Sequence, residues 1–220
     1  MPSAVEADVW IFDLDNTLYP AECRLFDQID VRMGAFISEL LSVDRVEARR
    51  IQKLYFMEYG TTLRGLMDRH GVAPEDFLAY VHDIDVSPVP PNARLARALA
   101  RLDGRKLVYT NGSAKHAGNV LQRLGVAGHF EGVFDIAGAD YVPKPDRRAY
   151  DRMVELFSVT PGRAVMIEDM ARNLIPAAAM GMTTVWLDAG HEWGAADHDP
   201  DSIHHTIDDL TDWLEEQVAG

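Results

Sequence analysis

Short apolar segments bounded by turn-forming residues recur along the chain, and five have the length and β-branched or aromatic content of buried strands. They are residues 8–12, 106–110, 132–136, 164–167 and 183–187. Helical patterns separate the last four of these segments. Apolar strands that alternate with helices predict an α/β fold with a doubly wound parallel sheet of the Rossmann-like type.

Three helices between these strands have recognisable ends or faces. Ser113 is suited to cap a helix that runs to about Leu124, where Gly125 ends it. A second helix is expected over residues 146–157, whose apolar residues share one face, and a short third helix over residues 173–180. These helices supply the covering layers that a buried parallel sheet requires.

The interval between the first two strands has a different pattern, which is wholly helical from about residue 22 to residue 82. Its apolar residues follow a spacing of three to four, starting with Leu25, Ile29, Met33, Phe36 and Leu40. We therefore expect an inserted α-helical cap subdomain at residues 19–89. The remaining residues, 1–18 and 90–220, would form the core.

Capping and turn residues divide this helical interval into several helices. Asp44 and Glu47 have the spacing of a capping box at a helix start. Gly60 and Gly71 are suited to end helices, and Pro74 is suited to the first turn of another. The expected cap is thus a set of short helices.

Charge and composition narrow the class of protein. The net charge of −14 over 220 residues disfavours binding to nucleic-acid polymers and to anionic membranes. The single cysteine, Cys23, excludes a disulfide framework. Residues 1–10 lack the pattern of a signal peptide, and no apolar run approaches the roughly 20 residues of a membrane helix. We expect a cytoplasmic protein, and the sequence does not determine its oligomeric state. The acidic residues 191–201 are expected in a surface loop.

Two carboxylates follow the first predicted strand. Asp13 and Asp15 are two positions apart, so both side chains point the same way in an extended segment. Open α/β sheets bind ligands at the carboxyl ends of their strands. The pair therefore indicates a ligand site, although an acidic turn that simply ends the strand is the alternative interpretation.

The next three strand ends also carry polar residues suited to chemistry. Thr110 and Asn111 precede a helix start, where a hydroxyl and free N–H groups bind anions. Lys144 lies between two prolines, and the adjacent Glu168 and Asp169 offer hard oxygen ligands for Mg²⁺. Each feature alone also fits an ordinary turn or a surface charge. Together they supply a nucleophile, a metal site, phosphate donors and a charge neutraliser.

The order and content of these motifs resemble the haloacid dehalogenase-like (HAD) hydrolase superfamily. The four similar segments are FDLDNTLYP at 12–20, VYTNGS at 108–113, VPKPD at 142–146 and IEDMARN at 167–173. The helical interval lies between the first and second motifs, as in the helical-cap branch of that superfamily. The resemblance covers essentially the whole chain and implies a HAD core with an inserted α-helical cap.

The resemblance implies a role in phosphoryl transfer for each matched residue. Asp13 would be the nucleophile that forms an aspartyl-phosphate. Asp15 would be the general acid for the leaving alcohol and then the base for the hydrolytic water. Thr110 and the backbone N–H of Asn111 would bind the phosphate, and Lys144 would balance charge on the phosphoryl group and the nucleophile.

A Mg²⁺ site is also implied by the resemblance. Asp13, Asp169 and the backbone carbonyl of Asp15 would coordinate the ion. Glu168 would act through a metal-bound water. Asn173 would lie in the surrounding layer and orient the catalytic lysine.

The second acid, Asp15, separates functions within the superfamily, because dehalogenases do not carry it in its phosphatase role. We expect a small phosphate monoester as substrate. The segments DNTLYP, YGTTLRGLM at 59–67 and VHDID at 81–85 resemble pyrimidine 5′-nucleotidases and imply a pyrimidine nucleoside 5′-monophosphate. The alternatives are a phosphoglycolate or sugar-phosphate phosphatase, a phosphoacceptor switch or binding protein on a HAD scaffold, and a 2-haloacid dehalogenase.

Three cap residues, Thr61, Thr62 and Arg64, follow Gly60 at a predicted helix start. One interpretation places them against the base or sugar of the substrate. The other has Thr61 or Thr62 capping the helix.

The cap is expected to move as a lid on hinges at residues 19–20 and 87–92. A lid over the strand ends would exclude water during phosphoryl transfer and open for product release. We expect His82, Asp83 and Asp85 to belong to a solvated hinge rather than to line the entrance.

Overall fold

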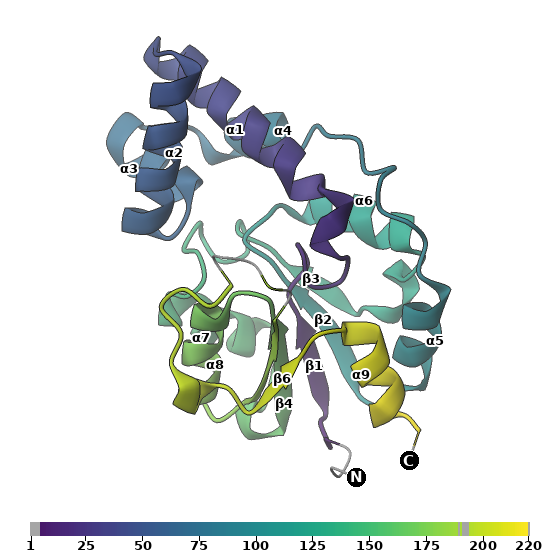
Figure 1. Cartoon of the computed structure of the whole chain (residues 1–220). Coiled ribbons are helices and arrows are strands. Elements are labelled where there is room, and N and C mark those ends of the chain that lie inside the picture. Colours follow the sequence, from purple (N-terminus) through teal and green to yellow (C-terminus); the bar gives the residue numbers. More distant parts are fainter. Residues whose placement is uncertain (1–4, 189, 191–193, 220) are drawn as a thin grey trace.

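A computed structural model describes residues 5–188, 190 and 194–219 of the chain. Within these residues, parallel strands form one six-stranded sheet with the order β3-β2-β1-β4-β5-β6 (Figure 1). The strands are β1 (Val9–Phe12), β2 (Arg105–Tyr109), β3 (Gly132–Phe134), β4 (Ala164–Glu168), β5 (Thr183–Leu187) and β6 (His205–Ile207). The helices of this part are α5 (Ala93–Arg101), α6 (Ala114–Leu124), α7 (Arg147–Leu156), α8 (Leu174–Ala179) and α9 (Leu210–Gln217). The predicted doubly wound α/β fold is confirmed.

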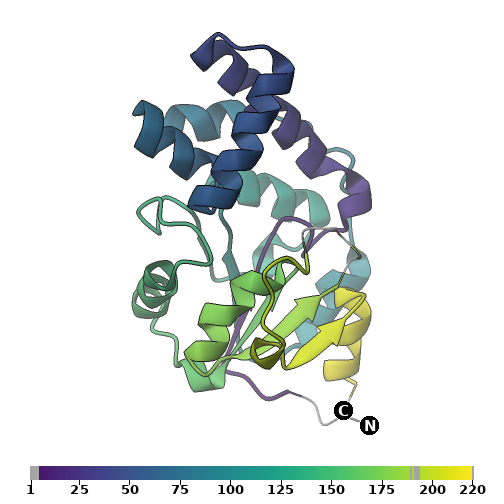
Figure 2. The same cartoon turned by 60° about the vertical axis from the view of Figure 1, so that its left-hand side comes forward.

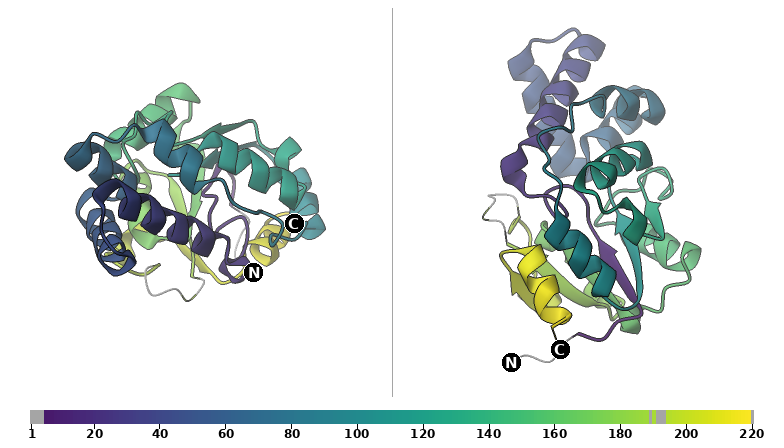
Figure 3. Two further views of the ribbon diagram at one scale, coloured as in Figure 1. Left: turned by 90° about the horizontal axis from the view of Figure 1, so that it is seen from above. Right: turned by 90° about the vertical axis from the view of Figure 1, so that its right-hand side faces the viewer.

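Alternate side chains of β1 point to opposite faces of the sheet and pack against two helical layers. Trp10 and Phe12 lie in the core that α5, α6 and α9 cover, and α5 and α9 lie together in the right-hand view of Figure 3. Val9 and Ile11 lie in the core that α7 and α8 cover. Because both faces of this central strand are buried, its sequence is apolar throughout.

Some elements are absent from the sequence predictions. β6 has three residues and pairs only with β5, at the edge of the sheet. Its side chains are half-buried or exposed, so it shows no apolar run. The helices α5 and α9 were also not predicted. Among the described residues, no helix is long and apolar enough to cross a lipid bilayer.

Four helices between β1 and β2 lie above the carboxyl edge of the sheet (Figures 1 and 2). They are α1 (Leu25–Leu41), α2 (Arg45–Tyr59), α3 (Thr62–His70) and α4 (Pro74–Val81). Their shared apolar core includes Ile29, Ile37, Leu66, Phe77 and Val81. Leu40, predicted on the buried face of α1, is 42% exposed because it lies in the last turn of that helix. The limits of core and cap at residues 18–19 and 89–90 remain predictions.

Most predicted helix ends in the cap are present. The N–H of Glu47 donates to Asp44 Oδ1 over 2.9 Å at the start of α2. Gly60 and Gly71 end α2 and α3 with positive φ values, which glycine adopts without strain. The other half of the predicted capping box is wrong, because the Glu47 carboxylate accepts hydrogen bonds from the Arg50 guanidinium instead.

The acidic segment predicted as a surface loop is described from Gly194 onward, and residues 191–193 lie outside the described residues. The described aspartates of this segment are exposed. The Gly194 carbonyl accepts a 2.8 Å hydrogen bond from the N–H of Ala171, and the His198 ring stacks on Trp186. The segment therefore lies on the surface beside the loop that follows β4.

Candidate active site at the carboxyl edge of the sheet

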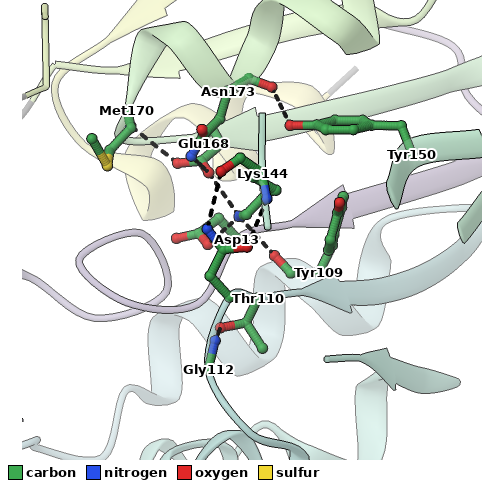
Figure 4. Close-up of polar contacts among 10 residues, drawn as sticks. Asp13, Tyr109, Thr110, Gly112, Lys144, Tyr150, Glu168, Met170 and Asn173 are labelled. Atoms are coloured by element: carbon green, nitrogen blue, oxygen red, sulfur yellow. Dashed lines mark hydrogen bonds and ion pairs between the residues drawn. The ribbon is translucent and has the colours of Figure 1, made fainter. Parts of the chain in front are cut away.

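Charged and polar side chains from several strand ends meet at one edge of the sheet (Figure 4). Asp13 directly follows β1, Thr110 follows β2, and Glu168 ends β4. β1 pairs with both β2 and β4, so the ends of these three strands are adjacent. Lys144 reaches the same place from the connection between β3 and α7. The parallel sheet thus gathers residues that are far apart in the sequence.

Lys144 is buried between two carboxylates, with its side chain 1% exposed. Its Nζ donates to Asp13 Oδ1 over 2.6 Å, to Glu168 Oε1 over 2.7 Å and to the carbonyl of Tyr109 over 3.0 Å. Burial alone would lower the pKa of this ammonium, but the charges of Asp13 and Glu168 outweigh burial and hold the pKa above its ordinary value. Lys144 is therefore a fixed cation at neutral pH.

The backbone of Lys144 is held by Asn111. The Lys144 N–H donates to Asn111 Oδ1 over 2.9 Å, and Asn111 Nδ2 lies 3.4 Å from the Lys144 carbonyl oxygen. This side-chain role was not predicted from the sequence, which assigned only the backbone N–H of Asn111 to phosphate binding. The Thr110 hydroxyl accepts a 2.9 Å hydrogen bond from the Gly112 N–H, which ties it to the same turn. Phosphate binding by this turn remains a prediction.

Glu168 has hydrogen-bond partners at both carboxylate oxygens. Oε1 accepts from Lys144 and, over 2.6 Å, from Asn173 Nδ2, while Oε2 accepts over 3.0 Å from the Met170 N–H. Burial would raise the pKa of Glu168, but the charge of Lys144 and the hydrogen bonds of Asp169, Lys144 and the Met170 N–H lower it below its ordinary value. Asn173 was predicted to orient the lysine, and it contacts the lysine's partner Glu168.

Asp13, Glu168 and Asp169 are buried and offer carboxylate oxygens that all lie within 4.8 Å of one another. Burial and the nearby Glu168 charge raise the pKa of Asp13 to about 7 and hold that of Asp169 well above its ordinary value. Lys144 is the one cation bonded to this group among the described residues. Three carboxylates beside a single ammonium group suit a divalent cation, because such ions prefer hard oxygen ligands. Because Glu168 is already hydrogen-bonded, Asp13 and Asp169 are the side chains best placed to bind such an ion directly.

Asp15 has different surroundings from Asp13. Its Oδ1 accepts a 2.6 Å hydrogen bond from the Tyr19 hydroxyl and lies 2.8 Å from His116 Nε2. Burial would raise the pKa of Asp15, but the charge and hydrogen bond of His116, with that of Tyr19, lower it to about 2. The Asp15 side chain does not belong to the acidic cluster. Metal binding through its backbone carbonyl remains a prediction.

Two histidines near Asp15 were not assigned to the site from the sequence. The rings of His82 and His116 are stacked, with centroids 4.6 Å apart and planes inclined by 10°. The expectation that His82 lies in a solvated hinge is wrong, because this stack partly buries it, whereas Asp83 and Asp85 are exposed as predicted. Nothing in the sequence distinguishes His116 from an ordinary core residue on the buried face of α6.

All three cap residues predicted to face the substrate have partners within the cap. Thr61 caps α3 by accepting from the Arg64 N–H over 3.1 Å, as in the alternative interpretation. The substrate interpretation is corrected for Thr62, which is buried in the cap with its hydroxyl donating to the Gln52 carbonyl. Arg64 pairs with Asp68 on the same helix, and its contact with substrate remains a prediction.

Comparisons with known proteins agree with this geometry. The family "Hydrolase: haloacid dehalogenase-like hydrolase" matches residues 7–181. Phosphate metabolism protein 8 of Saccharomyces cerevisiae is 28% identical over 192 residues, which are 79% of this chain and 59% of that protein. The phosphoglycolate phosphatase of Mesorhizobium japonicum is 26% identical over 94% of this chain and 95% of its own length.

A solved structure has the same fold over nearly the whole chain. It is the HAD phosphatase from Thermococcus onnurineus, with a TM-score of 0.64 and 19% sequence identity. The alignment covers 97% of this chain and 98% of that one. At this identity the likeness shows the fold alone.

Proposed function

The chain belongs to the haloacid dehalogenase-like hydrolase family, and from this premise we propose that it is a phosphatase that hydrolyses small phosphate monoesters through an aspartyl-phosphate on Asp13. One observation carries the proposal. Asp13 is paired with the buried Lys144 and lies next to Asp169, while a second acid, Asp15, is held outside the acidic cluster by its own partners. Two carboxylates in different surroundings suit a nucleophile and a separate acid–base residue.

In the first half-reaction, a carboxylate oxygen of Asp13 attacks phosphorus and the bond from phosphorus to the leaving oxygen breaks. Asp15 has to hold a proton at this step, although His116 and Tyr19 lower its pKa to about 2 in the substrate-free protein. It gives that proton to the leaving oxygen, so the alcohol leaves neutral and Asp15 returns to the carboxylate form. Lys144 faces the attacked group from beside Asp13 and balances the charge on the phosphoryl oxygens.

In the second half-reaction, the Asp15 carboxylate takes a proton from a water molecule whose oxygen attacks phosphorus. The bond between phosphorus and Asp13 breaks, which releases inorganic phosphate and restores both residues. A Mg²⁺ ion held by Asp13 and Asp169 would add its positive charge to that of Lys144 in balancing the phosphoryl oxygens. Thr110 and the Asn111 N–H are proposed to bind the phosphate.

The proposed substrate is a pyrimidine nucleoside 5′-monophosphate, on the resemblance of the first motif and the cap segments to pyrimidine 5′-nucleotidases. A phosphoglycolate or sugar-phosphate substrate is the second candidate, because the relative named phosphoglycolate phosphatase aligns over almost the whole of both chains. A phosphoacceptor switch, a binding protein or a dehalogenase is less well supported, since Asp15 completes a hydrolytic cycle. The proposal retains the cytoplasmic location predicted from the sequence.

The proposal is tested by phosphate release from UMP, CMP, AMP, GMP, phosphoglycolate and hexose phosphates, with and without Mg²⁺. The wild-type chain is compared with Asp13→Asn and with Asp76→Asn, a control at an exposed position on α4. We expect Mg²⁺-dependent turnover that Asp13→Asn abolishes and Asp76→Asn keeps. Preference for UMP or CMP supports the nucleotidase, and preference for phosphoglycolate supports the second candidate.

Other outcomes would contradict the proposal. A stable phosphorylated protein without turnover would favour the switch. Halide release from a 2-haloacid, without phosphate release from the panel, would favour the dehalogenase.

A further inference from the structure

A stacked pair of histidines joins the cap to the core beside Asp15. His82 is the residue that ends α4, the last cap helix, and its Nδ1 lies 2.9 Å from Ser113 Oγ of the core. Its ring stacks on that of His116, in the first turn of α6. The contact between cap and core at this point is therefore made by two aromatic rings and a polar atom pair.

His116 connects this contact to the proposed acid–base residue. The His116 side chain has no exposed surface, and its Nε2 lies 2.8 Å from Asp15 Oδ1. The Tyr19 hydroxyl donates to the same oxygen over 2.6 Å. Two partners on one oxygen restrict rotation of the carboxylate about its side-chain bonds.

The other oxygen of Asp15, Oδ2, lies near the predicted phosphate-binding turn. A Cβ atom placed on Gly112 would lie 3.7 Å from Asp15 Oδ2 and 3.5 Å from His116 Cδ2. Among the described residues, none forms a hydrogen bond with Oδ2. The arrangement thus fixes Oδ1 and leaves Oδ2 free to exchange a proton next to the turn of Thr110 and Asn111.

Both ends of the cap contribute to the surroundings of Asp15, Tyr19 directly and His82 through its contact with His116. Tyr19 lies in the connection from β1 to α1, and His82 lies at the start of the return connection to α5. A displacement of α4 from the core would separate His82 from His116 and Ser113. The orientation of Asp15 therefore depends on the position of the cap.

We propose that His116, braced by the stacked ring of His82, is a positioning residue that aims Asp15 Oδ2 at the leaving oxygen of the substrate and couples that aim to cap closure. The inference rests on the proposed phosphatase function. It predicts that His116 matters for protonation of the leaving group, whereas a purely structural histidine would affect all substrates alike.

The test compares kcat/KM for two substrates of different leaving groups. p-Nitrophenyl phosphate releases a phenolate that needs no proton, whereas UMP or another alkyl phosphate turned over by the wild type releases an alkoxide that does. His116→Phe keeps a ring against His82 but removes the donor to Asp15, and His116→Gln keeps a donor without the ring. His129→Gln, on the 3₁₀ turn Ala127–His129, is the control.

We expect His116→Phe to lower kcat/KM on the alkyl phosphate by roughly 10- to 100-fold, a part of the total that general acid catalysis supplies. The loss on p-nitrophenyl phosphate should stay within about threefold, because its leaving group does not use the acid. His116→Gln should recover part of the alkyl-phosphate activity. His82→Leu, at a partly exposed position, should show the same selective loss in smaller measure.

The two proposals fail in distinguishable ways. Absence of wild-type turnover on both substrates overturns the phosphatase and this inference with it. Wild-type turnover with equal losses on both substrates, or with no loss, overturns the role of His116 alone. If thermal melting shows that His116→Phe does not fold, the selective loss in His82→Leu decides the question, and its absence overturns the inference.

Discussion

The ammonium nitrogen of Lys144 lies 2.6 Å from Asp13 Oδ1, although the two residues are 131 positions apart in the sequence. Both side chains are almost wholly buried. Glu168 shares the same ammonium group on its other side. This contact places a permanent positive charge beside the proposed nucleophile, and it makes the stability of the site depend on one lysine.

Replacement of Lys144 by methionine should destabilise the metal-free protein by about 3–5 kcal/mol, the cost of leaving partners of a buried ion pair uncompensated. Urea unfolding of the metal-free protein measures this. Lys115→Met, exposed on α6, is the control and should change stability little. Lys144→Arg should keep more stability than methionine but lose most phosphatase activity, because a guanidinium is larger and planar. Wild-type stability in Lys144→Met would contradict the ion-pair assignment.

Asp13 should make the metal-free protein less stable as pH rises from about 4 to about 7. Its pKa is raised from 3.8 to about 7, so in this window the folded state holds a proton that the unfolded state has lost. Stability falls by at most about 1.4 kcal/mol per pH unit from this residue. Glu168, with a lowered pKa, acts in the opposite sense only below about 4.5. Asp169, whose pKa is also raised, acts in the same sense as Asp13. Unfolding curves across this pH range should therefore show a slope in the wild type that is smaller in Asp13→Asn.

Binding of Mg²⁺ near pH 6 should stabilise the protein and release protons. The raised pKa values of Asp13 and Asp169 mean that the ion displaces protons from buried carboxyls. Calorimetric titration in two buffers of different ionisation enthalpy measures the number released. Asp169→Asn should weaken Mg²⁺ binding and reduce the release. Equal heats in both buffers would contradict this protonation of the empty site.

Asn173→Ala should reduce stability by about 1–2 kcal/mol and lower kcat more than it raises KM. The amide is buried and donates to the Glu168 oxygen that also accepts from Lys144, so its loss frees both side chains to move. Asn119→Ala, at an exposed position on α6, should be neutral in both measurements. Unchanged kinetics in Asn173→Ala would show that Glu168 is held well enough by its other partners.

Gly60→Ala should impair activity, whereas Gly71→Ala should not. Both glycines have positive φ at the ends of cap helices, so alanine is strained at each by roughly 1 kcal/mol or more. A Cβ at Gly60 would also lie 3.3 Å from Pro143 and 3.7 Å from the Lys144 carbonyl oxygen, while one at Gly71 meets nothing within 4 Å. Steady-state kinetics and thermal melting of both variants separate the effect of backbone strain from disturbance of the loop that carries Lys144. Equal kinetics in the two would contradict a cap contact with that loop.

Local patterns in the sequence were sufficient to predict the five main strands, the α/β class and the helical interval between the first two strands. Each of these features depends on periodicity or on a turn residue within about one element. α5 also has such a pattern, with Leu95, Ala98 and Leu99 buried on one face, so this helix was predictable from the sequence as well. β6 has none, because a three-residue edge strand buries too little to leave one.

The motif residues at the strand ends, from Asp13 to Asn173, could be placed at one edge of the sheet from the sequence alone, because parallel strands that alternate with helices align their carboxyl ends. Which of them touch was decided by tertiary structure. The path of the connection between β3 and α7 brings Lys144 between Asp13 and Glu168. The end of α4 brings His82 against His116, and the first turn of α6 brings His116 against Asp15, 101 positions away. Such contacts leave no periodic trace, since they depend on where separate elements meet and not on the order of residues within either one.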